Sequence, residues 1–129
     1  MDPLFLSLED VVAIHKDQIA RYGGAAEIRD PLLLQSAVAQ PQASFGGEYL
    51  HRDVFEMAAA YLFHIVQNHA FVDGNKRAGA VSAVSFLYLN GFKVLVEEDG
   101  FEEMVLAVAQ GQMDKKAIAA FLERYAHPL

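Results

Sequence analysis

The sequence predicts an all-α fold, a single domain over residues 1–129 with about six helices. Apolar residues recur at helical spacing between recognisable helix starts and stops. Almost no sheet is expected, and Phe92–Val96 could be one short strand or extended segment. A chain of 129 residues can build one hydrophobic core but not comfortably two.

The first part of the chain carries two predicted helices with local signals at their ends. Ser7–Asp10 resembles a capping box, and the helix that follows stops at Gly23–Gly24. Asp30–Pro31 marks a second helix start, since proline is tolerated in the first turn. That helix runs to about Gln40, where Pro41 ends it.

A long apolar helix is predicted in the middle of the chain, after a segment without helical pattern. The pattern is lost from Gln42 to Leu50, and Ser44–Gly47 is expected to be a mobile loop or a short hairpin. Asp53 then opens a helix from Val54 to about Asn68. Its apolar residues go nearly all the way round, which indicates a position in the centre of the fold.

The rest of the chain continues the helical pattern. A broadly apolar helix is predicted from about Lys76 to Asn90, closed by Gly91. Two amphipathic helices follow, at about Gly100–Ala109 and about Asp114–Ala126. The two central apolar helices therefore flank a single polar break, and a polar loop in such a position suggests a functional site.

Composition narrows the classes of function. The net charge is −7 and the ten Lys and Arg residues are scattered, so direct binding to nucleic acid is not expected. The absence of cysteine fits the reducing cytoplasm. No signal peptide is predicted, and the most apolar stretch, Met57–Val66, is too short to span a membrane. The hydrophobic fraction of 53% predicts an apolar surface patch for a partner.

The segment His69–Arg77 combines residue types that bind phosphate. A helix that starts near Gly74 presents free N–H groups and the positive end of its dipole, which together attract anions. Gly74 lets an oxygen approach the backbone, and Asn75 offers amide donors. Lys76 and Arg77 add cations. Because cations at a helix start oppose the dipole, their position suggests a bound anion.

Two more residues of this segment complete the requirements of phosphoryl or nucleotidyl transfer. Asp73 is a hard oxygen ligand that suits Mg²⁺. His69 is a candidate general base for a hydroxyl nucleophile, and Phe71 is expected to anchor the loop in the core. Each residue has an ordinary alternative, since Asp-Gly-Asn is a common turn and histidines often end helices.

The segment resembles the signature of the Fic/Doc family, which in the Fic branch reads His-x-Phe-x-(Asp/Glu)-Gly-Asn-Gly-Arg-x-x-Arg. Here Lys76 stands at the second glycine and Ala80 at the second arginine. A lysine at this position is similar to the Doc (death-on-curing) branch. Three flanking matches extend the resemblance over about residues 8–126. They are Arg21–Gly24, Asp30–Pro31 and Phe86–Gly91.

The resemblance implies a Fic fold with a short flap and a Doc-like kinase that transfers the γ-phosphate of ATP to a protein hydroxyl. It implies His69 as the base and Asp73 as the Mg²⁺ ligand. Gln42–Leu50 would be the flap that aligns the target segment. The nucleotide phosphates would be held by Gly74, Asn75, Lys76 and Arg77.

The resemblance also implies a biological setting, the toxin of a toxin–antitoxin pair. The usual target of Doc toxins is elongation factor Tu, phosphorylated on a threonine, which inhibits translation. Ser44 and Glu48 resemble a self-inhibitory Fic motif, but the arginine that such a glutamate pairs with is replaced by Ala80. Inhibition is therefore expected from a partner, the antitoxin.

Two alternatives remain open from the sequence. The first is AMP transfer to a hydroxyl, the reaction of Fic proteins. The second is a catalytically silent module that binds a nucleotide or a partner through the same loop, against which the intact His69 and Asp73 argue.

Overall fold

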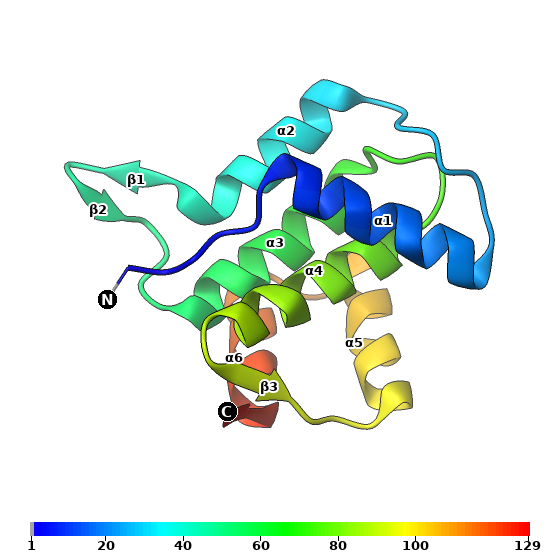
Figure 1. Cartoon of the computed structure of the whole chain (residues 1–129). Helices are drawn as coiled ribbons and strands as arrows, with labels where there is room; N and C mark the ends of the chain where they lie inside the picture. Colours follow the sequence, from blue (N-terminus) through cyan, green and yellow to red (C-terminus); the bar gives the residue numbers. More distant parts are fainter. Residues whose placement is uncertain (1) are drawn as a thin grey trace.

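The computed structural model describes residues 2–129, and this part of the chain folds mainly into α-helices (Figure 1). The predicted all-α class is confirmed, and most helix ends fall within one residue of the expected ones. The helices are α1 (Leu8–Tyr22), α2 (Pro31–Ala39), α3 (Val54–Asn68), α4 (Asn75–Leu89), α5 (Glu98–Ala109) and α6 (Lys115–Tyr125).

Local capping chemistry explains where several helices begin. Ser7 Oγ accepts a hydrogen bond from the Asp10 N–H, and the Asp10 carboxylate accepts one from the Ser7 N–H, which is the predicted capping box. Asp30 caps α2 and Asp53 caps α3 in the same way, through side-chain oxygens. In contrast, α5 begins at Glu98, two residues before the predicted start.

The strands are short and form two antiparallel pairs. After a 3-10 turn (Gln40–Gln42), β1 (Ser44–Phe45) and β2 (Glu48–Tyr49) make a hairpin that projects from the helices in Figure 1. Of the two expected outcomes for this segment, the structure contains the hairpin.

The second strand pair corrects the predicted end of the last helix. β3 (Phe92–Val94) pairs with β4 (Ala126–Pro128), a pairing that the sequence did not predict. Ala126 was expected to end α6 but adopts an extended backbone and opens β4. The carbonyl of Tyr125 then accepts a hydrogen bond from the N–H of Leu95. Strand pairing thus gives partners to backbone groups of both β3 and β4.

The core is centred on α3 and α4, which run through the middle of the molecule in Figure 1. α1 and α2 lie on one side of this pair, and α5 and α6 lie on the other. α3 is buried on nearly all sides, as its apolar pattern predicts. No helix within residues 2–129 is long and apolar enough to cross a membrane.

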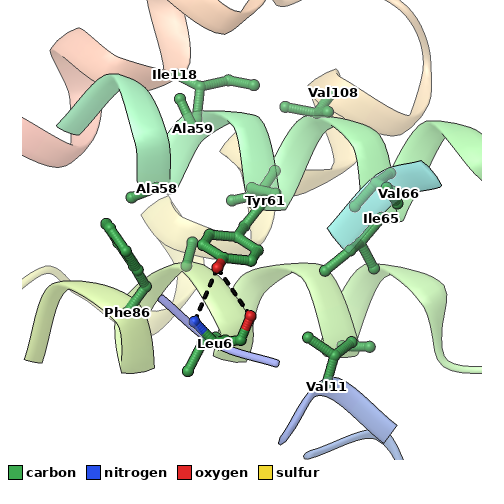
Figure 2. Packing of buried hydrophobic residues seen from close by; sticks show 14 of the residues in the cluster. Leu6, Val11, Ala58, Ala59, Tyr61, Ile65, Val66, Phe86, Val108 and Ile118 are labelled. Atoms are coloured by element: carbon green, nitrogen blue, oxygen red, sulfur yellow. Dashed lines mark hydrogen bonds between the residues drawn. The ribbon is translucent and has the colours of Figure 1, made fainter. Parts of the chain in front are cut away.

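A buried tyrosine fastens the segment before α1 to α3. The hydroxyl of Tyr61 accepts a hydrogen bond from the Leu6 N–H at 2.8 Å and donates one to the Leu6 carbonyl (Figure 2). Burial raises the pKa of Tyr61 to about 12, so the phenol stays protonated and can act as this donor. The contact helps to hold α1 over the central pair.

Gly79 allows α3 and α4 to approach closely. A Cβ atom on Gly79 would lie 2.8 Å from Val66 Cγ2 and 3.2 Å from the Leu62 carbonyl oxygen. These distances are too short for a methyl group without movement of one helix. The contact sets the spacing of the two helices close to the loop that joins them.

Replacing Gly79 with alanine is therefore expected to lower the free energy of unfolding by about 1–2 kcal/mol. The matched control is Gly100→Ala in α5, where the new Cβ would meet nothing nearer than Val96 Cγ2 at 3.9 Å. That control is expected to raise stability by about 0.5–1 kcal/mol, because alanine favours helix more than glycine does. Urea denaturation followed by circular dichroism measures both. Equal effects of the two variants would contradict the close helix contact.

Candidate active site

His69 stands at the junction of α3 and the loop that leads to α4. It is the C-cap of α3, with a left-handed backbone at φ 49° and ψ 45°. It is the only non-glycine residue within residues 2–129 with a positive φ. This conformation costs a residue with a Cβ about 1–2 kcal/mol, so surrounding contacts must hold it. The side chain itself is exposed and can reach an incoming group.

Asn75 closes the loop from inside. Its side-chain oxygen accepts a hydrogen bond from the Phe71 N–H, and its amide donates to the Phe71 carbonyl at 2.9 Å. The same amide nitrogen lies 3.5 Å from Nδ1 of His69. Since the side chain is buried and engaged within the loop, a phosphate contact from Asn75 would come from its backbone N–H. The predicted phosphate role itself stays a prediction.

Phe71 anchors the loop in the core, as expected, and its partner is His15 of α1. The two rings stack with centroids 3.6 Å apart and planes 6° from parallel. His15 Nε2 donates a hydrogen bond to the Asp73 carbonyl at 2.7 Å. From the sequence alone, His15 is expected to be a surface or packing residue. Nothing local in the sequence could show its contact with the loop, because it lies 58 positions away.

Asp73 points its carboxylate toward the segment after α1. Oδ2 accepts a hydrogen bond from the Ala25 N–H at 2.8 Å. Within residues 2–129, Oδ1 has no hydrogen-bond donor in range. The side chain is exposed and keeps an oxygen available for a hard cation, so it fits the predicted Mg²⁺ ligand. No cluster of three or more His, Asp or Glu side chains suited to a metal occurs within the described residues.

The start of α4 forms an anion cradle. Gly74 is the N-cap at φ 79° and offers no side-chain cap, so within residues 2–129 the N–H groups of the next three residues have no acceptor. A Cβ on Gly74 would lie 3.3 Å from His15 Nε2. The cradle opens into a hollow of about 450 Å³. It is lined by Tyr22, Gly23, Gly24, Asp73, Gly74, Asn75, Lys76 and Arg77.

The two cations of the loop differ in their surroundings. Lys76 is exposed and takes part in neither of the two salt bridges found within residues 2–129. Arg77 donates hydrogen bonds to the carbonyls of Gln18 and Gly23 and lies over the Tyr22 ring. These bonds use two of the five N–H donors of the guanidinium. Arg77 therefore fastens the end of α1 and keeps donors for an anion.

A second, larger groove continues from this hollow. It has a volume of about 730 Å³ and lies between α4 and α5, with Lys76 and Arg77 at one end. Ala80 lies in the wall of the groove, directly beyond the cradle. The wall is mainly apolar, and two acidic side chains line it. Its other residues are Gln18, Tyr22, Val81, Val84, Glu98, Phe101, Glu102, Val105 and Leu106.

The hairpin of β1 and β2 exposes its aromatic side chains. Phe45 is 83% exposed and Tyr49 is 42% exposed, so neither is a core residue. The sequence alone does not decide whether these two side chains are core residues or flap contacts. Exposed aromatic residues on a projecting hairpin can contact another protein.

The remaining histidines take no part in the loop. His64 accepts a hydrogen bond from Lys115 Nζ of α6 at 3.1 Å. Burial, and then the nearby charge of Lys115, lower the pKa of His64 to about 4, so it is neutral near pH 7. Burial is also the largest cause that lowers the pKa of His51. From the sequence, His64 is expected in the core or beside the loop, and its half-buried position with a bond to α6 favours the core.

The chain is similar in sequence to known proteins. A family model described as the Fic/DOC family matches residues 5–87. The chain is 38% identical over 124 residues to a protein of Mycolicibacterium smegmatis named Toxin Doc, covering 95% of this chain and 93% of that one. It is 32% identical over 119 residues to Protein kinase doc of Escherichia phage P1, covering 92% and 93% of the two chains.

Proposed function

Because the chain belongs to the Fic/DOC family, we propose that it is a Doc-like protein kinase and the toxin of a toxin–antitoxin pair. One observation carries this proposal. His69 lies at one end of a loop whose other end is the anion cradle of α4, with Asp73 between them. A base, a cation ligand and a phosphate cradle are thereby joined in a single short segment.

The proposed reaction is transfer of the γ-phosphoryl group of ATP to a hydroxyl of a protein. His69 takes the proton of the hydroxyl as its oxygen forms a bond to the γ-phosphorus. The bond from the γ-phosphorus to the oxygen bridging to the β-phosphate breaks, and ADP leaves. Lys76, with the remaining donors of Arg77 and the free N–H groups of α4, neutralises charge on the phosphates.

Asp73 is the proposed protein ligand for Mg²⁺. When bound, the ion would neutralise charge on the phosphate oxygens and help to align them. The free oxygen of the Asp73 carboxylate beside the cradle supports this assignment. The Ala25 N–H fixes the other oxygen and so orients the carboxylate.

Two residues of α4, Lys76 and Ala80, favour transfer of the γ-phosphate over transfer of AMP. Lys76 stands where Fic proteins have a glycine, so a side chain occupies the space in which the α- and β-phosphates of ATP lie against the helix start in that branch. Ala80 provides no second cation, and its surroundings in the groove are apolar. A nucleotide in the AMP-transferring pose would therefore lack both its closest backbone approach and one of its charges.

Two labelled forms of ATP test this proposal in extracts that contain the native target. ATP labelled at the γ-phosphate should mark a protein, whereas ATP labelled at the α-phosphate should not. The opposite result would show that the enzyme transfers AMP. Failure of both labels would favour the silent binding module.

The proposed partners follow from the family. The target would be elongation factor Tu, as for the Doc toxins that the chain resembles, which would set the site of action in the cytoplasm. The hairpin with its exposed Phe45 would align the target segment. The apolar groove beside Ala80 would receive the antitoxin, and its acidic Glu98 and Glu102 favour an apolar segment with basic residues.

A further inference from the structure

The left-handed backbone of His69 depends on a segment that precedes α2, residues 27–30. The Ala70 carbonyl accepts hydrogen bonds from the N–H groups of Arg29 and Asp30, at 2.7 and 3.0 Å. The Val72 N–H donates to the Glu27 carbonyl at 3.1 Å. Residues 27–30 therefore lie along the loop as a short antiparallel bridge, which fixes the peptide groups that follow His69.

The side chain of Arg29 holds the peptide group of His69 itself. Its Nε donates a hydrogen bond to the His69 carbonyl at 2.8 Å, and its Nη2 donates a second one to the same oxygen. This carbonyl belongs to the C-cap of α3, where the helix dipole is negative and a cation is favoured. Two donors from one planar group restrict the orientation of the carbonyl more than one donor could.

We propose that Arg29 is a positioning residue for His69. With the carbonyl of residue 69 held by Arg29 and that of residue 70 held by the backbone of residues 29 and 30, the φ and ψ angles of His69 are fixed. Those angles set the direction in which the imidazole leaves the backbone. This inference rests on the proposed role of His69 as the base, although the conformation of His69 can be measured without any activity.

A purely structural role for Arg29 makes a different prediction. If Arg29 only capped α3, its removal would lower stability and leave the rate of the folded enzyme unchanged. Arg29 is exposed, so its contribution to stability is expected to be small. A misplaced base should instead lower kcat, since small displacements of a reacting group cost large factors in rate.

The test compares Arg29→Met with Arg29→Lys, and uses Arg21→Met as the matched control. Arg21 is also an exposed arginine, but it pairs with Asp17 on α1. Nuclear magnetic resonance of the backbone of His69 reports its φ and ψ angles. Transfer kinetics with ATP labelled at the γ-phosphate give kcat and KM. Circular dichroism verifies that each variant is folded.

Arg29→Met is expected to shift the His69 backbone resonances away from left-handed values and to lower kcat by about tenfold to a hundredfold, with KM for ATP nearly unchanged. Arg29→Lys should be intermediate, and Arg21→Met should match the wild type. Unchanged His69 resonances in folded Arg29→Met, or in Arg29→Lys if the first does not fold, would overturn the proposal. If Arg29→Met shifts the His69 resonances but the wild-type protein itself transfers no phosphate, Arg29 still positions His69 and the proposed kinase activity is wrong.

Discussion

Replacing His69 with alanine is expected to lower the rate of phosphate transfer by about a hundredfold to ten-thousandfold, the usual cost of losing a general base. The imidazole is exposed at the end of α3, and the one hydrogen bond found for its ring within residues 2–129 joins Nδ1 to the Asn75 amide at 3.5 Å. Its removal therefore costs one long hydrogen bond to a side chain that also bonds to Phe71. The fold should persist, because the backbone contacts of residues 69 and 70 remain.

The measurement is initial-rate transfer from ATP labelled at the γ-phosphate, beside thermal unfolding of the same samples. His127→Ala is the matched control, since His127 is an exposed histidine on β4, away from the loop. Wild-type activity in His69→Ala would remove the base from the proposed mechanism. Loss of the folded structure would mean that the side chain has a structural role instead.

The second large effect is expected at Asp73. Transfer should require Mg²⁺ or a similar hard cation, and Asp73→Asn should lower the rate by about a hundredfold and weaken the response to Mg²⁺. Asparagine keeps an oxygen that can accept the hydrogen bond from the Ala25 N–H, so the loop should keep its shape. What it loses is the negative charge that a cation requires.

A magnesium titration of the transfer rate measures both effects. Asp17→Asn serves as the control, because Asp17 is an exposed carboxylate that forms a salt bridge with Arg21 on the same helix. Full transfer by wild-type enzyme in excess chelator would assign Asp73 another role. If Asp73→Asn lowers the rate but leaves the dependence on magnesium concentration unchanged, Asp73 is not the magnesium ligand either.

Helix ends were predictable because the chemistry that creates them is local. Ser7, Asp30 and Asp53 bond to N–H groups two or three residues along the chain, and such pairs can be recognised in sequence. Ala126 shows the limit of this approach. Its extended backbone depends on pairing with β3, and no neighbouring residue indicates that pairing.

In the candidate site, too, local features could be predicted from the sequence and contacts between distant segments could not. Residue types in the loop predict a base, a cation ligand and a cradle, and the structure places the start of α4 where the cradle was expected. They did not reveal that Asn75 uses its side chain to close the loop, or that Arg77 reaches Gln18 and Gly23. His15 and Arg29 were missed for the same reason, because their contacts with the loop join distant parts of the chain.

The distance of these anchors along the chain has a consequence for the order of folding. His15 lies 58 positions from Asp73, and Arg29 lies 40 positions from His69. α3 and α4 are neighbours in sequence and can pair early, but the loop between them needs α1 and residues 27–30 as well, at a larger cost in loop-closure entropy. The reactive geometry should thus be acquired late. Local opening of α1 should also disrupt the geometry of this loop while α3 and α4 stay paired. Backbone amides of the loop should therefore exchange hydrogen faster than those of α3.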